Sequence, residues 1–146
     1  DLSTKEFYQV NCKTYERQKM NCPFSYEQFE RIDKEAEKRN ISGKYAICDA
    51  EGNVHSVAYV IFDNKVCQGI FSGSNPSYRQ SNAATLLLWH ILKESIRRGC
   101  TEYDFNGSML KPIETFIRHF GAEQTPYFLI EKKYSKLYSL LKKLKR

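Results

Sequence analysis

Apolar residues recur at helical spacing over the first forty residues of the chain, which predicts two helices. The first covers residues 3–19, and the second begins at Ser25, where Ser25 and Gln28 form a capping box. The apolar stripe of the second helix contains Phe29, Ile32 and Ala36. We expect this stripe to face the core and the charged residues around it to face solvent.

After residue 43 the apolar residues alternate, which is the pattern of half-buried strands. Three strands are predicted, over residues 44–48, 54–62 and 65–71. The turn signals Glu51-Gly52-Asn53 and Asp63-Asn64 join them, so the three strands should pair as an antiparallel meander.

A long helix over residues 82–98 follows the third strand, and Gly99 ends it. The run Leu86-Leu87-Leu88-Trp89 predicts burial on nearly all sides at the start of this helix. The chain returns at once as a strand over residues 102–105, so strand, helix and strand should form a right-handed parallel unit. A second helix and a last strand extend the core to residue 131. The predicted fold class is therefore α/β (α+β), a mixed and mainly antiparallel sheet with flanking helices.

The 146 residues fit one domain, with N-terminal helices in residues 1–43, a core in residues 44–131 and a basic C-terminal helix in residues 132–146. The formal net charge of +6 is concentrated in that last segment, which holds seven Lys/Arg and no acid. We expect the tail to dock by its apolar stripe, or else to contact an anionic membrane surface or tRNA phosphates. The chain begins at Asp1 rather than Met, which favours a fragment of a longer protein. No apolar run approaches the roughly 20 residues of a membrane span, so we expect a cytoplasmic protein.

The five cysteines and three histidines do not form a metal-binding pattern. No C-x-x-C pair occurs, and no histidine has a second ligand at the spacing of a metal site. We therefore predict reduced thiols, no metal, and His55 facing solvent on a strand. Cys67 would need an adjacent base to act as a nucleophile, so a buried structural thiol is the favoured interpretation.

A polar loop at residues 72–81 leads directly to the start of the long helix. A helix N-terminus carries unsatisfied N–H groups and a partial positive charge, and ligands tend to bind beyond the carboxyl ends of parallel strands. Arg79 adds a charge that can bind a phosphate in bidentate fashion. The loop thus predicts a site for a phosphate-bearing ligand. The equally weighted alternative is a polar connection in which Ser81 or Asn82 caps the helix.

The order of three strands, helix, strand, helix and strand resembles the GNAT superfamily of N-acetyltransferases. In that superfamily a [QR]-x-x-G-x-[GA] loop at the start of the central helix binds the pyrophosphate of acyl-coenzyme A. The segment that is similar to this loop contains Arg79, Gln80, Ser81, Asn82, Ala83 and Ala84, with Asn82 where the family usually has glycine. The resemblance implies that these residues bind acetyl-coenzyme A or another acyl-coenzyme A as the donor, without a metal.

Three further features stand out: Asn75-Pro76-Ser77-Tyr78 with Leu86-Leu87-Leu88-Trp89, then Tyr103-Asp104-Phe105-Asn106-Gly107-Ser108, and Phe116-Ile117-Arg118-His119-Phe120-Gly121. They are similar to segments of the Fem (FemAB-like) aminoacyltransferases of peptidoglycan synthesis and their two-lobe relatives. This resemblance implies a carboxyl-terminal lobe that works with an upstream GNAT-like lobe, and it offers aminoacyl-tRNA as the donor. Ile117 stands where Fem ligases have a functional lysine, and Arg118 lies about 100° further round the helix.

Acyl transfer to an amine needs hydrogen-bond donors that polarise the acyl carbonyl and a group that removes the amine proton. In the general family arrangement, the carbonyl donors would be the backbone N–H groups of Gly69, Ile70 and Phe71. Asp104 is the candidate base, Ser108 a candidate acceptor-site hydroxyl and Tyr127 a candidate acid for the leaving thiolate. The structural alternatives are a carboxylate that stabilises the turn after Asp104, a helix cap at Ser108 and a packing role for Tyr127.

The predicted function is an N-acyltransferase that moves an acyl group, acetyl in the first instance, from coenzyme A to an amine. The acceptor would be an amine-bearing small molecule or a peptidoglycan precursor. The alternatives are a Fem-type transferase that depends on aminoacyl-tRNA and a non-catalytic partner lobe.

Overall fold

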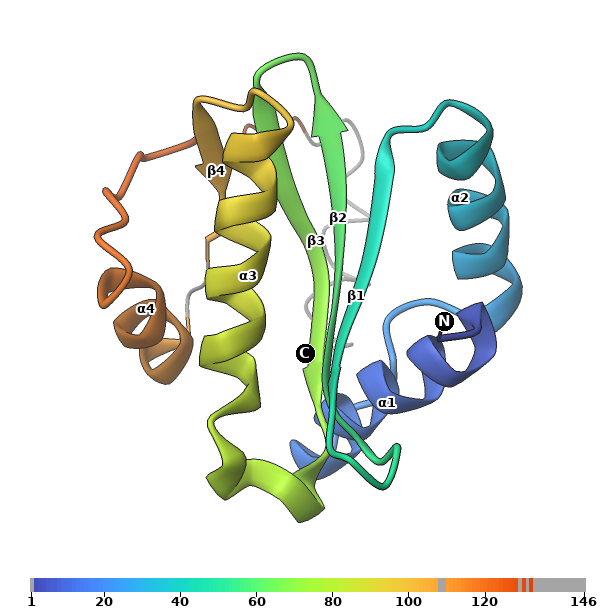
Figure 1. Ribbon diagram of the computed structural model, residues 1–146. Helices are drawn as coiled ribbons and strands as arrows, with labels where there is room; N and C mark the ends of the chain where they lie inside the picture. The colour runs from blue at the N-terminus through green and yellow to red at the C-terminus, as the bar shows by residue number, and fades with distance from the viewer. Residues whose placement is uncertain (1, 108–109, 129, 131, 133–146) are drawn as a thin grey trace.

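A four-stranded sheet forms the centre of the molecule, with helices on both of its faces (Figure 1). The computed structural model describes residues 2–107, 110–128, 130 and 132. In chain order the elements are α1 (Thr4–Arg17), α2 (Tyr26–Lys38), β1 (Ser42–Cys48), β2 (Val54–Asp63), β3 (Val66–Ser74), the 3₁₀ helix η1 (Pro76–Ser81), α3 (Ala83–Arg97), β4 (Glu102–Asp104) and α4 (Lys111–Arg118). Helices α1 and α2 pack against one face of the sheet, and α3 covers the other.

The strands lie in the order β1-β2-β3-β4, antiparallel from β1 to β3 and parallel between β3 and β4. The predicted meander, the parallel strand–helix–strand unit and the fold class are therefore confirmed. The last predicted strand is wrong over residues 122–128, which have no regular secondary structure. Pro126 lies within this short run and has no N–H to donate to a strand ladder.

Both N-terminal helices begin at capping boxes. Ser3 Oγ accepts the N–H of Glu6 at 3.2 Å, and Ser25 Oγ accepts the N–H of Gln28 at 3.3 Å. In each box the side chain at the third helical position returns a hydrogen bond to the cap residue's N–H. These reciprocal bonds fix where the two helices start.

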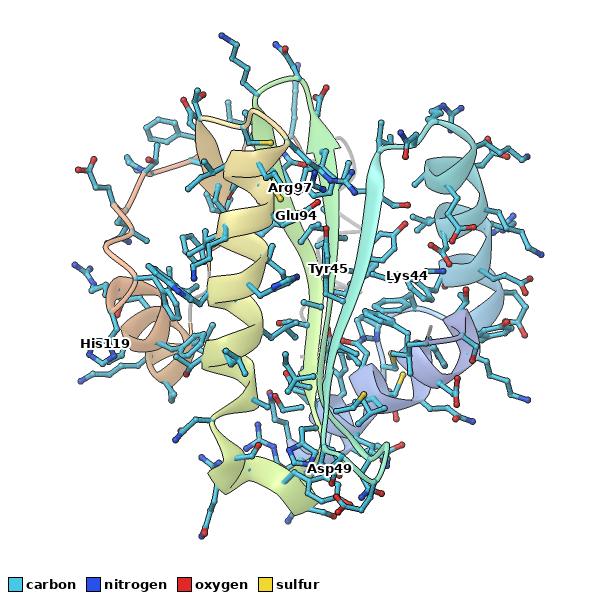
Figure 2. The ribbon with its side chains drawn as sticks, in the orientation of Figure 1. Lys44, Tyr45, Asp49, Glu94, Arg97 and His119 are labelled. Carbon is cyan, nitrogen blue, oxygen red and sulfur yellow. The ribbon has the colours of Figure 1, made fainter. Side chains whose placement is uncertain are left out.

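The inward face of α2 differs from the predicted stripe, because Asp33 is buried in place of Ile32. Asp33 is 1% exposed, whereas Ile32 is 46% exposed. Lys44 of β1, which is labelled in Figure 2, explains the exchange, because its Nζ donates to Asp33 Oδ2 at 2.6 Å. The same Nζ donates to Glu37 Oε1 at 2.8 Å and to Thr4 Oγ1 at 3.0 Å. Burial opposes the lysine charge, but the hydrogen bonds to the two carboxylates prevail and raise the pKa of Lys44.

Two clusters of buried side chains lie on the two faces of the sheet. The cluster under α3 contains Ala58, Val60, Phe62, Cys67, Leu87, Ile91 and Cys100. The cluster under α1 and α2 contains Phe7, Val10, Phe29, Val57 and Tyr59. The start of α3 is not buried on all sides, because Leu86 and Trp89 are 56% and 53% exposed. Only one face of this helix meets the sheet, as in an ordinary amphipathic helix.

Candidate acyl-donor site

Strand β4 is short and pairs with β3 along its whole length, so their pairing ends where β4 ends. Their parallel register runs from Val66 opposite Glu102 to Gln68 opposite Asp104. Beyond Gln68, the edge of β3 on the β4 side has no strand partner in the part of the chain that the structure describes. Backbone N–H and C=O groups require hydrogen-bond partners. We call the space beside this unpaired part of β3 the wedge. It is suited to a ligand that carries amide groups of its own.

A β-bulge lies where the wedge opens. The pairing of β3 with β2 shifts register so that Ile70 has no partner between Gly69 and Phe71. These are the three residues whose N–H groups we predict as carbonyl donors. Gly69 also permits a close approach by β4, because a Cβ at this position would lie 2.8 Å from the hydroxyl of Tyr103. Burial raises the pKa of Tyr103, so its hydroxyl stays protonated. This hydroxyl lies beside Gly69, and the sequence did not indicate it.

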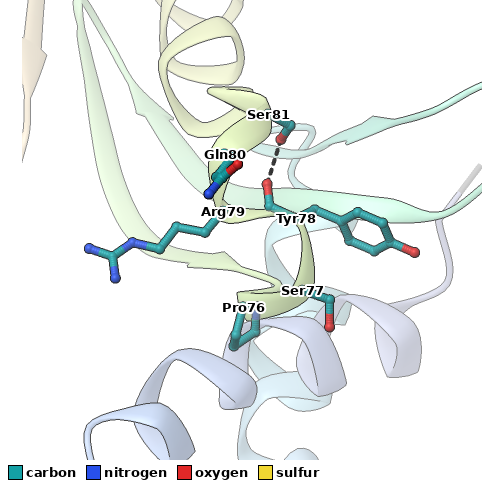
Figure 3. A pocket seen from close by; sticks show the side chains of 6 residues that line it. All are labelled: Pro76, Ser77, Tyr78, Arg79, Gln80 and Ser81. Carbon is teal, nitrogen blue, oxygen red and sulfur yellow. Dashed lines mark hydrogen bonds between the residues drawn. The ribbon is translucent and has the colours of Figure 1, made fainter.

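Helix η1 forms the predicted donor loop and carries a hollow on its surface (Figure 3). Residues 76–81 line this hollow, whose volume is about 510 Å³. Arg79 is exposed, and its guanidinium extends away from the loop backbone. Ser81 Oγ donates to the carbonyl of Tyr78 at 2.7 Å and ties the two ends of the last turn together. The loop thus combines a fixed backbone with an arginine that can reach a phosphate.

The start of α3 combines a weakly bonded backbone N–H group with one that is available to a ligand. Asn82 precedes α3 with a positive φ of 55°, and its side chain makes no cap. Ser81 Oγ accepts the N–H of Ala83 at a long 3.4 Å, and none of the described residues accepts the N–H of Ala84. Asparagine tolerates the left-handed conformation better than most residues, which explains how it occupies the glycine position of the loop pattern. The bond from Ala83 to Ser81 agrees with the capped alternative, whereas the N–H of Ala84 is open to a ligand, so the donor loop stays a prediction.

His55 of β2 packs against Tyr78 of η1, so the prediction that His55 faces solvent is wrong. Its side chain is 14% exposed, and its Nε2 lies 3.2 Å from Asp49 Oδ2. Its ring stacks on that of Tyr78, with centroids 4.1 Å apart and an angle of 6° between the planes. The sequence carries no signal for this contact, because the three residues come from a turn, a strand and a loop without motif spacing.

The three predicted catalytic side chains are placed differently. Asp104 ends β4 and is exposed, and its Oδ1 accepts the N–H of Asn106 at 2.7 Å, as the turn-stabilising alternative predicts. Tyr127 is 84% exposed in a segment without regular secondary structure. Ser108 lies outside the described residues. Catalytic roles for all three stay predictions.

The structure also tests the predictions for Cys67, for a metal site and for a membrane span. Cys67 is fully buried, and burial raises the pKa of its thiol to about 11, in agreement with a structural role. Within residues 2–107, 110–128, 130 and 132, no group of three His, Cys, Asp or Glu side chains is arranged to hold a metal ion. Over the same residues, no helix has the length and apolar character needed to cross a bilayer.

Solved structures of N-acetyltransferases share this fold. An acetyltransferase from Trypanosoma brucei is 16% identical, with a TM-score of 0.64 over 90% of this chain and 96% of the other. Glucosamine-6-phosphate N-acetyltransferase from Arabidopsis thaliana is 12% identical, with a TM-score of 0.63 over 92% of this chain and 95% of the other. The aminoglycoside N-acetyltransferase AAC(6')-Iy in complex with CoA is 15% identical, with a TM-score of 0.67 over 90% of this chain and 89% of the other. These likenesses show that the chain has the fold of the N-acetyltransferases.

A family model described as "Acetyltransferase (GNAT) domain" matches residues 3–123. The chain belongs to this family. No curated protein matches its sequence. Membership confirms the predicted GNAT resemblance and the acyltransferase class, and it is consistent with acyl transfer from CoA to an amine.

Proposed function

We propose that this chain transfers an acyl group, acetyl in the first instance, from coenzyme A to the amine of a small molecule. The observation that carries the proposal is the bulge at Ile70, which lies just past the point where the pairing of β3 with β4 ends. A thioester bound in the wedge would have its carbonyl against backbone N–H groups of the bulge. Such preorganised donors stabilise the negative charge that develops on a carbonyl oxygen during acyl transfer.

The bulge and the donor loop are separated by a distance that suits one coenzyme A molecule. The extended stretch from Ile70 to Pro76 spans roughly 20 Å, a reach comparable with an extended pantetheine arm. In the proposed pose, the pyrophosphate binds Arg79 and the N–H groups of Ala83 and Ala84. Gln80, Ser81 and Asn82 complete the loop around it. The pantetheine arm then follows the open edge of β3 to the bulge.

The proposed reaction is a direct attack of the acceptor amine on the thioester carbonyl. A nitrogen–carbon bond forms and the carbon–sulfur bond breaks, through an oxyanion bound by the N–H groups of residues 69–71. Asp104 is proposed to accept the amine proton, and Tyr127 to protonate the departing thiolate. Ser108 is proposed to orient the acceptor.

The acceptor is proposed to be an amine-bearing small molecule. One support is the fold shared with AAC(6')-Iy, an aminoglycoside N-acetyltransferase also solved with the bisubstrate analog CoA-S-monomethyl-acetylneamine. A peptidoglycan precursor that carries a primary amine is the other acceptor, supported by the Fem-like motifs. A cytoplasmic location suits either acceptor, because acyl-coenzyme A is made and used there.

A Fem-type lobe that uses aminoacyl-tRNA is the second candidate, supported by the order and spacing of those motifs. It would include an upstream lobe and contacts of residues 132–146 with tRNA or a membrane surface. The environment of Arg118 disfavours it. Arg118 pairs with Glu114 and donates to Gln124 Oε1 at 3.3 Å, so it is held at the α4 surface rather than in place of the Fem lysine.

Calorimetric titration with acetyl-coenzyme A tests the proposal. We expect saturable binding that Arg79→Ala weakens about 10-fold to 100-fold, because a hydrogen bond to a charged group contributes about 1.5–3 kcal/mol. Arg31→Ala is the matched control: it removes an exposed arginine from α2, on the other face of the sheet, and should leave the affinity unchanged. S-acetylpantetheine lacks the pyrophosphate, so its weaker binding should not depend on Arg79.

Lack of coenzyme A binding by the unaltered chain would refute the proposal. Binding of aminoacyl-tRNA by that same chain would then favour the Fem-type function. If neither donor bound, the non-catalytic partner lobe would become the preferred function.

A further inference from the structure

We propose that His55, oriented by Asp49, is a positioning residue for the donor loop: its ring fixes Tyr78 and thereby the place of Arg79. This inference rests on the proposed function, because it concerns the affinity of the loop for coenzyme A. The loop pattern does not include His55, which lies on a different element. The contact between them is a property of the folded chain.

The turn between β1 and β2 holds the imidazole through Asp49. Asp49 Oδ1 accepts the backbone N–H of Asn53 at 2.7 Å, and Oδ2 accepts Asn53 Nδ2 at 2.8 Å. Hydrogen bonds from Asn53, with a smaller contribution from His55, lower the pKa of Asp49. The carboxylate is therefore charged at neutral pH and can only accept. His55 Nε2 is therefore the donor in the 3.2 Å hydrogen bond to Asp49 Oδ2. This bond fixes the plane of the imidazole ring.

The oriented imidazole is part of a wider attachment between β2 and η1. The N–H of Asn75 donates to the carbonyl of His55 at 2.8 Å, and Asn75 Nδ2 donates to the carbonyl of Val54 at 3.4 Å. Asn75 Oδ1 also accepts the N–H of Ser77 at 3.2 Å, which starts η1. The backbone bonds anchor the beginning of the loop, and the ring stack on Tyr78 anchors its middle.

The middle of η1 needs this support because its helix is interrupted there. Tyr78 has φ −116° and ψ 24°, outside the helical range. Short 3₁₀ segments have poor hydrogen-bond geometry and little stability of their own. Tyr78 also borders two hollows, the one at η1 and a second of about 610 Å³ between α1 and the β1–β2 turn. Among the described residues, Tyr78 has one aromatic partner, which is His55.

The position of Tyr78 affects coenzyme A binding through Arg79, the next residue in the chain. Arg79 is exposed, and its direction depends on the backbone between Tyr78 and Ser81. Without the imidazole, Tyr78 can rotate into the neighbouring hollow, and the guanidinium then samples positions away from the pyrophosphate. An arginine that must be ordered on binding contributes less affinity than one held in place.

Coenzyme A affinities of single variants, measured by calorimetry, test the inference. His55→Ala should weaken binding roughly fivefold, which corresponds to the loss of one aromatic pair. His55→Phe keeps a flat ring and should restore most of the affinity. His90→Ala is the matched control, because the His90 ring contacts Tyr45 of β1 at 5.8 Å and not the loop. Its affinity should equal that of the unaltered chain.

A double-mutant cycle separates positioning from general destabilisation. If His55 acts through Arg79, His55→Ala should lower the affinity less than about twofold further in the Arg79→Ala background. A full fivefold loss in that background, or unchanged affinity in His55→Ala alone, overturns the inference and leaves the proposed function in place. Failure of the unaltered chain to bind coenzyme A overturns both.

Discussion

Lys44→Met should destabilise the α1–α2 layer strongly, because it leaves Asp33 buried without its cation. The side chains of Asp33 and Lys44 are 2% and 19% exposed, and Nζ and Oδ2 lie 2.6 Å apart. Removing one partner of a buried ion pair costs about 3–5 kcal/mol. Thr4 Oγ1 still donates to Asp33 Oδ2 at 2.7 Å. Since this bond remains and the lysine is partly exposed, we expect a loss of about 3 kcal/mol.

Urea denaturation followed by circular dichroism measures this free energy of unfolding. For a chain of this size, the loss corresponds to a fall in Tm of roughly 6–12 °C. Adding Asp33→Asn to Lys44→Met removes the stranded charge and should recover more than about 1 kcal/mol. Lys34→Met is the matched control, because Lys34 is 63% exposed in its pair with Glu30 and should change the stability little. A loss below about 1 kcal/mol for Lys44→Met, or no recovery in the double variant, would refute the reasoning.

The same pair predicts a change in stability at alkaline pH. The pKa of Lys44 is raised above its ordinary value of 10.5, so the folded chain holds this proton more tightly than the unfolded chain. The stabilising contribution is present in full below pH 10.5 and is lost as the pH rises through the folded pKa. The stability difference between the unaltered chain and Lys44→Met should therefore narrow above pH 10.5. A difference that stays constant or widens in denaturation curves across this range would contradict the assignment.

Three further predictions concern backbone geometry and thiols. Gly73→Ala would place a Cβ 2.6 Å from the Cα of Asn11, so α1 must shift, and thermal unfolding should show a cost of about 1–3 kcal/mol. Asn82→Ala should cost about 1 kcal/mol in the same assay because φ at this position is 55°, whereas Asn82→Gly should be nearly neutral. Ellman's reagent near neutral pH should label exposed Cys48 quickly and buried Cys67 only on unfolding. Fast labelling of Cys67 would contradict its burial.

The features predicted correctly from the sequence depend on neighbours in the chain. The capping box at Ser25, the turn signals around Gly52 and the stop at Gly99 are all local, so the order of elements follows from them. Asn82 shows the limit of this reasoning. Its place before a helix predicted either a cap or a glycine substitute, and only the positive φ without a cap bond distinguishes the two.

The features that the sequence did not predict depend on segments that meet in space. Periodicity predicts Ile32 in the core because it takes no account of Lys44, whose charge brings Asp33 inward. The sequence alone predicts that His55 faces solvent, because its partners come from a turn and a loop that lie elsewhere in the chain. The bulge at Ile70 arises from the register between two strands, which no single strand encodes.

Within the described residues, the edge of β3 beyond Gln68 has no strand partner, and this bears on how the protein behaves in concentrated solution. A strand edge with unpaired backbone groups is a template to which a strand of another molecule can add. Coenzyme A bound in the proposed pose would cover this template with the amides of its pantetheine arm. The donor would then act as a removable edge strand, which completes the sheet while it is bound and blocks self-association at this edge for that time.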